Sequence, residues 1–191
     1  MKKLVLVFCF FLFSTSILFS QEGWFWQNPL PQGNDLNGVD FVDTDIGWAV
    51  GNVGTILKTT NGGTTWMIQS SNSIRSLNDV SFIDENNGIV VGDYGTILKT
   101  SNGGTTWSLQ LSGTTKDLNG LSFTDVNNGT VVGDSLTILR TSDSGITWVS
   151  QSGITWIYQH QHDIVNFYDV SFTDLNYGTL VGYTWDLWSY T

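Results

Sequence analysis

Thr59-Thr-Asn-Gly-Gly-Thr-Thr-Trp66 is an eight-residue stretch that the chain uses three times. It returns as Thr-Ser-Asn-Gly-Gly-Thr-Thr-Trp over 100–107 and as Thr-Ser-Asp-Ser-Gly-Ile-Thr-Trp over 141–148, so its closing tryptophan recurs every 41 residues. A fixed period of this length is typical of repeat proteins, in which each unit is one supersecondary structure stacked on the next. The repeat therefore indicates the fold class before any single residue does.

Two further segments recur every 41 residues, with one step of 49 before the last copy, and are predicted to be β-strands. Leu36–Phe41 alternates apolar with small polar residues, as a strand with one buried face does, and its copies start at Leu77, Leu118 and Phe167. A nearly continuous apolar run follows in each unit, which indicates a strand covered on both faces; these runs lie at 48–51, 89–92, 130–133 and 179–182. A third strand leads into the eight-residue motif, and a fourth is expected to begin at its tryptophan.

Four short strands per unit, joined by Gly, Asn and Asp turns, predict an all-β fold, a β-propeller of four-stranded blades. Helical repeats are disfavoured by the density of Gly, Thr, Asn and β-branched residues. About four blades are present, and the expected repeats span 36–76, 77–117, 118–166 and, incompletely, 167–191. The third is longer because Ser144–Gln151 is followed by a near copy, Ser152–Gln159. We expect an incomplete arc; the alternative is a closed four-bladed ring in which Trp24–Gln27 completes the last blade.

The first twenty residues are predicted to be a secretory signal peptide and not part of the fold. Lys2 and Lys3 precede an apolar run that is too short to span a membrane, and cleavage is expected near Ser20 and Gln21. The propeller domain then covers 21–191. We expect a secreted protein, extracellular or periplasmic, without a membrane span. The one cysteine, Cys9, lies in the signal, so the mature chain has no thiol for catalysis, disulfides or metal binding.

The charge of the mature chain argues against one class of partner. Without Lys2 and Lys3 it keeps five cations against 17 acidic residues. An acidic surface repels phosphate, so nucleic acid is not an expected partner. A protein or a glycan remains as the expected partner.

The eight-residue motif is expected to form a turn. Its Asn or Asp accepts hydrogen bonds from nearby backbone amides, its last glycine takes a positive φ, and its tryptophan packs beneath the turn. None of these roles needs a ligand, and we predict no catalytic, cofactor-binding or metal-binding residue. The motif positions are Thr59, Asn61, Gly63, Thr65 and Trp66, then Thr100, Asn102, Gly104, Thr106 and Trp107, then Thr141, Asp143, Gly145, Thr147 and Trp148.

Two other positions recur from unit to unit and are assigned to structure. One is an aspartate in the turn after the first strand, found as Asp43, Asp84, Asp125 and Asp174. Its repetition in every unit is what turn chemistry predicts, so catalysis is not expected there. The other is a cation on the third strand, found as Lys58, Lys99 and Arg140, which we expect to be solvated.

Partner binding is expected where the units differ, because variable loops carry the function of repeat proteins. The connections after the fourth strand vary most, and so does the turn between the second and third strands, whose last copy is expected at Tyr183. Both should lie on one rim. The candidate partner-binding residues are Arg75, Asp93, Tyr94, Lys116, Asp134, His160 and His162. Each is equally consistent with a solvated loop position, and the two histidines lack the further ligands that a metal site needs.

The pattern Ser/Thr-x-Asp/Asn-x-Gly-x-Thr-Trp resembles the Asp-box, or bacterial neuraminidase repeat. Together with Leu-x-x-Val-x-Phe-x-Asp and Gly-Thr-Ile-Leu-x-Thr, the unit is similar over 36–182 to the repeat of the photosystem II assembly and stability factors, which are secreted or lumenal β-propellers. The resemblance implies a non-catalytic binding or scaffold module without a cofactor. Those factors engage their partner through an arginine-rich surface, and only Arg75 and Arg140 are present here, so that mode of binding is not implied.

Two other functions remain open. Asp-box propellers include sialidases, so the chain could belong to a glycoside hydrolase acting on sialic acid or on a neutral glycan. Sialidases hold the substrate carboxylate with three arginines, and this chain has two. The third hypothesis is an assembly chaperone of photosystem II itself, which depends on whether the source organism makes that complex.

Overall fold

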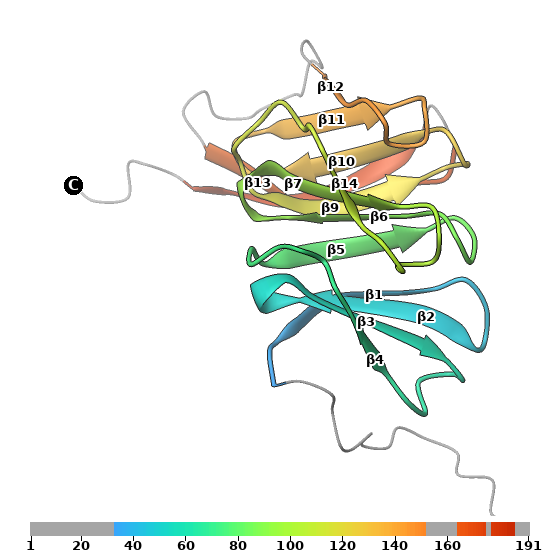
Figure 1. Ribbon diagram of the computed structural model, residues 1–191. Helices are drawn as coiled ribbons and strands as arrows, with labels where there is room; N and C mark the ends of the chain where they lie inside the picture. The colour runs from blue at the N-terminus through green and yellow to red at the C-terminus, as the bar shows by residue number, and fades with distance from the viewer. Residues whose placement is uncertain (1–32, 152–163, 175–176, 186–191) are drawn as a thin grey trace, which may run out of the picture.

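The computed structural model describes residues 33–151, 164–174 and 177–185, and these are built almost wholly of antiparallel strands (Figure 1). The helical segments among them are two short 3₁₀ turns, η1 (Asn52–Gly54) and η2 (Asp93–Gly95). The predicted signal peptide, Trp24–Gln27 and the second copy Ser152–Gln159 lie outside the described residues, and so do His160 and His162.

Three sheets of four strands and one of two follow one another along the chain, and we call them blades 1 to 4. Blade 1 is β1 (Leu36–Phe41), β2 (Ile46–Gly51), β3 (Thr55–Thr60) and β4 (Met67–Gln69). Blade 2 is β5 (Leu77–Phe82), β6 (Gly88–Gly92), β7 (Thr96–Thr100) and β8 (Ser108–Gln110). Blade 3 is β9 (Leu118–Phe123), β10 (Gly129–Gly133), β11 (Thr137–Thr141) and β12 (Val149–Ser150), and blade 4 is β13 (Ile164–Phe172) and β14 (Gly178–Trp185). Strands pair in chain order within each blade, which confirms the predicted propeller blades.

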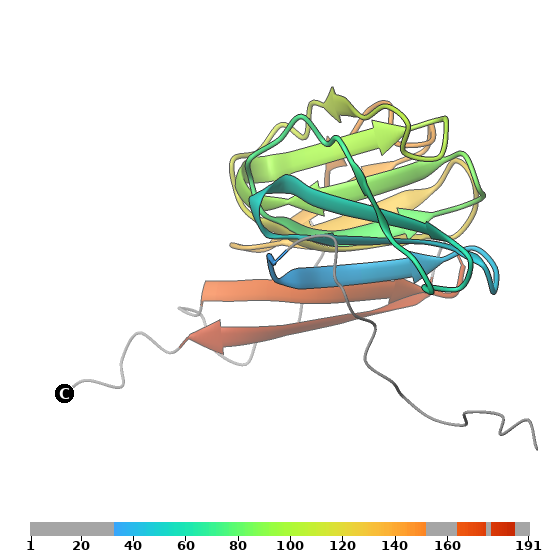
Figure 2. The same cartoon turned by 60° about the horizontal axis from the view of Figure 1, so that its bottom comes forward.

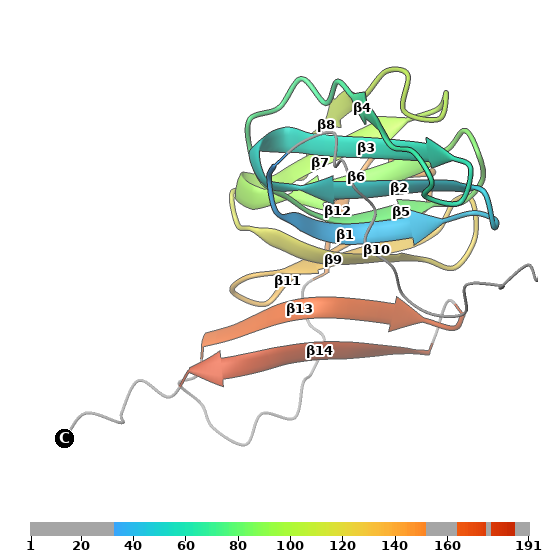
Figure 3. The ribbon, with the colours of Figure 1, turned by 90° about the horizontal axis from the view of Figure 1, so that it is seen from below.

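The blades form an open arc. The innermost strands β1, β5, β9 and β13 pack side by side in that order. Strand β1 lies at one end of this row and the hairpin β13–β14 at the other (Figure 1), and Figure 3 views the blades from the blade 1 end. Figure 2 shows the same arc tilted, with the inner strand β1 and the hairpin on one side and β7 and β8 on the other. The expected arc is thus confirmed for the described residues, whereas closure through Trp24–Gln27 stays a prediction.

The apolar core lies between blades. On one side of the first junction are Trp48, Val50 and Ile56 of blade 1, and on the other are Leu77 and Phe82 of blade 2. The Trp48 and Phe82 rings stack with their centroids 3.4 Å apart. Equivalent side chains join blade 2 to blade 3 and blade 3 to blade 4. Full burial of one such side chain stabilises the fold by about 1.5–3 kcal/mol, so these junctions hold the arc together.

A repeated asparagine, which the sequence analysis did not single out, latches each blade to the next. It is the second residue of the inner strand, and its Nδ2 donates to a backbone carbonyl oxygen of the next inner strand. The pairs are Asn37 to Leu77 at 2.9 Å, Asn78 to Leu118 at 2.9 Å and Asn119 to Phe167 at 2.8 Å. In blade 4 this position is Tyr168, whose ring stacks on Tyr183 with centroids 5.0 Å apart.

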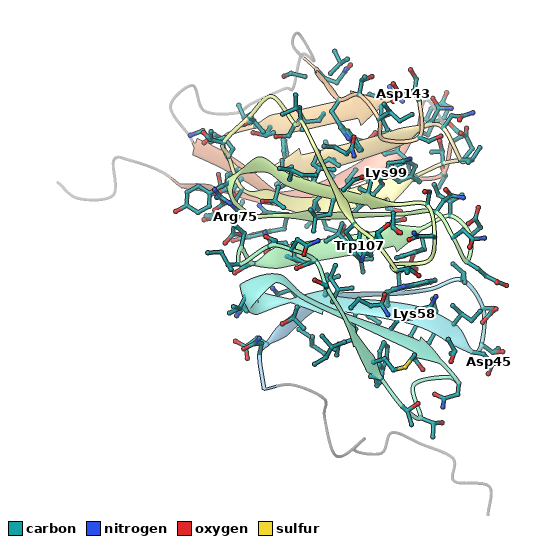
Figure 4. The ribbon with its side chains drawn as sticks, in the orientation of Figure 1. Asp45, Lys58, Arg75, Lys99, Trp107 and Asp143 are labelled. Atoms are coloured by element: carbon teal, nitrogen blue, oxygen red, sulfur yellow. The ribbon has the colours of Figure 1, made fainter. Side chains whose placement is uncertain are left out.

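The prediction that Lys58, Lys99 and Arg140 are solvated is wrong. Lys58 Nζ donates to the carbonyl oxygen of Gly103 in the next blade at 3.0 Å, and Lys99 Nζ donates to that of Ser144. The Arg140 guanidinium lies 5.9 Å from the centroid of the Phe172 ring, again in the next blade. All three side chains are half-buried, and desolvation lowers the pKa of Lys99. Each cation therefore clamps its blade to the following one; Figure 4 labels both lysines.

The eight-residue motif folds as the predicted turn. Asn102 Oδ1 accepts the Thr106 N–H at 2.9 Å, and Thr100 Oγ1 accepts the Gly104 N–H at 3.0 Å. Gly104 has φ +86°, and the Trp107 ring packs edge-on against Phe82. The copies at 59–66 and 141–148 repeat these bonds. The fourth strand starts one residue after the tryptophan in each case.

The turn aspartates form the predicted hydrogen bonds, whereas blade 4 lacks the turn that was predicted at Tyr183. Asp43 Oδ1 accepts the N–H groups of Asp45 and Ile46 at 2.7 and 2.6 Å, and Asp84, Asp125 and Asp174 accept equivalent backbone bonds. Tyr183, expected in a turn, instead pairs with Asn166, and β14 continues to Trp185. The other blades turn here at an Asn or Asp, within Asn-Val-Gly at 52–54, Asp-Tyr-Gly at 93–95 and Asp-Ser-Leu at 134–136. Blade 4 has Tyr-Thr-Trp at 183–185 without that Asn or Asp, so the strand runs on.

Aspartates on the inner strands join the blades through backbone amides. Asp79 Oδ1 accepts the N–H of Val80 in its own strand, and Oδ2 accepts that of Leu121 in blade 3, both at 2.8 Å. Burial raises the pKa of Asp79 to about 6, the nearby charges of Asp169 and Asp40 act in the same direction, and the two backbone bonds oppose them. The carboxyl is therefore a structural link that titrates above its usual range.

Replacing Asn78 with alanine should lower the free energy of unfolding by about 1–3 kcal/mol, because the change leaves the Leu118 carbonyl and the Asp93 carboxylate without their donor. Chemical denaturation followed by tryptophan fluorescence measures the change. The control is Asn86→Ala in the same blade, at an exposed side chain, which should stay within about 0.5 kcal/mol of the parent. Equal losses in the two variants would contradict the latch.

The Asp79 carboxyl should titrate near pH 6 in a carbon-detected NMR titration, and Asp143, held by bonds from Thr147 and Thr141, near pH 2. The folded pKa of Asp79 exceeds its unfolded value of 3.8, so the folded state binds this proton more tightly. The stability that this one group contributes is therefore full below about pH 4 and is lost as the pH rises through 6. Titration of Asp79 near 3.8 would disprove the burial argument, and titration of Asp143 near 3.8 would disprove the effect of its hydrogen bonds.

Candidate partner-binding rim

Two kinds of loop meet at one end of the blades. One is the turn between the second and third strands, and the other is the segment from the fourth strand to the next blade. Ser71 Oγ donates to the Gly54 carbonyl oxygen at 2.6 Å, and the Tyr94 N–H donates to Asp117 Oδ1 at 2.8 Å, so the two loops are bonded together in blades 1 and 2. Figure 4 places Arg75 at this end and Asp45 and Asp143, on the other turns, at the opposite end. We call the first end the rim.

The rim contains the same groove twice. In blade 1 a cavity of about 430 Å³ lies between Val53, Ile68 and Ser73, and in blade 2 one of about 640 Å³ lies between Tyr94, Leu109 and Thr114. These residues occupy equivalent positions one repeat apart, as do Gln69 and Gln110. Both volumes fall in the range of ligand-sized sites, about 300–1,000 Å³. The repeat therefore builds two neighbouring binding-sized grooves with one backbone and different side chains.

Three of the predicted rim residues meet in the second groove. Arg75, Tyr94 and Lys116 all line it, and the Arg75 guanidinium carbon lies 4.5 Å from the centroid of the Tyr94 ring. The Tyr94 side chain is 65% exposed and its backbone has φ +55°, so a left-handed turn presents the ring to solvent. The groove thus combines an aromatic surface with two exposed cations on a chain whose net charge is −10.

Two other predicted rim residues have structural bonds. Asp93 Oδ1 accepts from Asn78 at 3.1 Å and Asp134 Oδ1 accepts from Asn119 at 2.9 Å, so both carboxylates fix the blade latches. His160 and His162, as noted, lie outside the described residues. The asparagines that bind Asp93 and Asp134 were detectable in the sequence, because they recur one repeat apart at the second position of the inner strand.

Nothing in the described ranges, 33–151, 164–174 and 177–185, groups three or more His, Cys, Asp or Glu side chains in a way that could hold a metal ion. Over the same residues, no helix is long and apolar enough to cross a membrane. What the rim offers chemically is an open surface for hydrogen bonds, apolar contact and cation–carboxylate pairing.

Comparison with known proteins identifies the repeat. Solved structures that resemble the chain include "YCF48 bound to D1 peptide" (29% identity, TM-score 0.57, covering 65% of this chain and 43% of that one) and YCF48 from Cyanidioschyzon merolae (25% identity, TM-score 0.59, 72% and 47%). An ancestral GH74 enzyme matches at 15% identity, with a TM-score of 0.52, 78% of this chain and 24% of that one, which shows a shared fold alone. No curated protein sequence matches.

Fold and repeat together define a β-propeller of Asp-box units. The family model described as photosynthesis system II assembly factor YCF48 matches residues 19–108 and 71–150, which is most of the chain. The chain belongs to this family. It spans just under half the length of the two YCF48 structures.

Within the rim, Asp93→Ala and Arg75→Ala should separate structure from surface. The first removes the acceptor of Asn78 and should lower the free energy of unfolding by about 0.5–1.5 kcal/mol. The second removes an exposed side chain and should change it by less than about 0.5 kcal/mol. Urea denaturation of both variants measures this. A larger loss for Arg75→Ala would show that the guanidinium supports the fold.

Proposed function

We propose that the chain is a non-catalytic propeller module that binds an extended segment of a protein partner along the rim. The observation that carries the proposal is the duplicated groove, which places equivalent walls, Val53 with Ile68 and Tyr94 with Leu109, one blade apart. An extended chain is a natural occupant of two similar sites in a row, because its side chains also repeat at a regular spacing.

The side chains of the second groove and the family relationship both support a protein partner. Arg75 and Lys116 offer paired donors for carboxylate groups beside the Tyr94 ring, and aromatic and arginine side chains are the groups that most often anchor protein interfaces. One family member is recorded bound to a D1 peptide, and we extend peptide binding to this chain by analogy. A role in photosystem II assembly rests on the same analogy.

A binding role fits the carboxylates better than hydrolysis does. The repeated aspartates Asp43, Asp84 and Asp125 have lowered pKa values and are committed to structure. Asp43 accepts two backbone N–H groups of its turn, whereas Asp84 and Asp125 accept first the side-chain amide of Asn87 or Asn128 and then backbone N–H groups. A glycosidase needs two carboxyls facing each other across a cleft, one of them with a raised pKa. Asp79 has a raised pKa, but it lies between blades 2 and 3 with both oxygens bonded to amides. The hydrolase alternative is therefore supported by the shared fold alone.

The proposed site of action is outside the cytoplasm. The basic and apolar start of the chain, with expected cleavage near Ser20, supports export. The excess of acidic residues suits a soluble module that recruits its partner through a small cationic groove.

The double variant Tyr94→Ala, Leu109→Ala should lose its partner in a pull-down from cell-envelope proteins of the source organism. The two changes strip the aromatic and aliphatic walls from the second groove. Ile146→Ala is the control, because Ile146 is 60% exposed in a motif turn at the end opposite the rim. The unchanged protein and the control should retain the same protein.

Absence of any retained protein at micromolar bait, or retention by the double variant as well, would refute binding at this groove. Turnover of any member of a panel of chromogenic glycosides by the purified chain would refute the non-catalytic assignment.

A further inference from the structure

One end of the arc exposes a face that every other blade buries. Leu36, Val39 and Phe41 of β1 are 43%, 61% and 42% exposed, whereas their counterparts in blade 2 are 7% exposed or less. Leu36, Val39, Leu57 and Trp66 line a cavity of about 310 Å³, and the Phe41 ring packs edge-on against the Trp66 ring with centroids 6.0 Å apart. In blades 2 and 3 the preceding blade fills the equivalent space. The established blade junction therefore shows what kind of surface fits here, the following face of another blade.

The other end of the arc exposes that following face. Val181 of β14 is 56% exposed, although it occupies the position of Val50, Val91 and Val132, which are fully buried against the next blade. Figure 1 shows β1 and the hairpin β13–β14 at opposite ends of the row of inner strands. One chain thus carries both halves of a blade junction, and the described residues leave both uncovered.

The inner strands at the two ends of the arc also carry complementary residues, a glycine at one end and an aspartate at the other. The third position of the inner strand alternates as Gly38, Asp79, Gly120 and Asp169. Glycine is needed before each aspartate, because a Cβ on Gly38 would lie 3.0 Å from the Asp79 Cα, and one on Gly120 would lie 2.7 Å from the Asp169 Cα. The next residue in this alternation is a glycine, and Gly38 of another copy supplies it.

The same register provides a hydrogen bond across the new junction. Asp79 Oδ1 takes the N–H of its own Val80, and Oδ2 takes the N–H that follows the glycine of the next blade, Leu121. Asp169 Oδ1 likewise takes the N–H of Val170 at 2.7 Å, and its Oδ2 has no partner among the described residues. The equivalent donor is the N–H of Val39, the residue after Gly38.

We propose that two copies of the chain associate end to end, with blade 4 of each copy covering blade 1 of the other. A two-fold axis relates the two contacts and makes them identical. Val39 of the first copy meets Val181 of the second, and Val39 of the second meets Val181 of the first.

Val39→Asp and Val181→Asp test the two halves of the junction by analytical ultracentrifugation of the purified protein. The unchanged protein should sediment as a dimer, and each variant as a monomer with an unaltered circular dichroism spectrum, because a carboxylate in the apolar junction is not paired. Val149→Asp is the matched control: Val149 is also 61% exposed but lies on the outer strand of blade 3, so this variant should remain a dimer.

Mixing the two monomeric variants gives a sharper test. A mixed dimer keeps one junction with both valines intact, so association should return, though more weakly than in the unchanged protein. A monomeric unchanged protein would overturn the proposal, and a lower melting temperature of Val39→Asp in that case would show that another segment of the same chain covers the face. A Val181→Asp variant that remains a dimer would show that blade 1 contacts blade 1 of the other copy. Oligomers that grow in size with protein concentration would show an open filament. Either result would also overturn the proposal.

Discussion

The whole structure depends on the burial of one blade face against the next. A four-stranded sheet of this size has two apolar faces and too few residues to cover either, so each blade is stable only when neighbours cover it. Trp48 against Phe82 shows the scale of the contact, since two large rings stack across the first junction. The Asn37, Asn78 and Asn119 latches and the Lys58 and Lys99 clamps then fix the angle and spacing that the apolar contact leaves adjustable.

This constraint divides the residues into two groups. Residues that recur at the repeat step make turns, junctions or latches, and their hydrogen-bonding groups are occupied by those contacts. Asp143 illustrates the point, because hydrogen bonds from Thr147 and Thr141 lower the pKa of its carboxyl to about 2. The carboxylate is therefore ionised, but its oxygens are already bonded within the turn. Residues free to serve a partner are those that change from blade to blade, and Arg75, Tyr94 and Lys116 are the set that the fold gathers into one groove.

The fold does not choose the function. The same architecture appears in YCF48 and, at lower similarity, in a GH74 enzyme. The distinction has to come from the site. Here the repeated turn aspartates are bonded to backbone and asparagine amides, and the exposed rim combines an aromatic ring with cations; the binding role that we propose rests on these two observations. The open ends of the arc add a second kind of recognition, between blades of like design.

The sequence by itself determined the repeat unit, its strand order and its turn chemistry, because each of these is local and recurs from repeat to repeat. Asn102, Gly104 and the turn aspartate Asp84 could be assigned from spacing and residue type alone. Only the tertiary structure decided which residues meet across a junction. Lys58 looked solvated on its own strand, the recurrence of Asn78 did not reveal its partner, and Tyr183 looked like a turn residue. In each case the deciding partner lies on another strand or another blade, so the contact depends on how the sheets stack and has no signature within the segment itself.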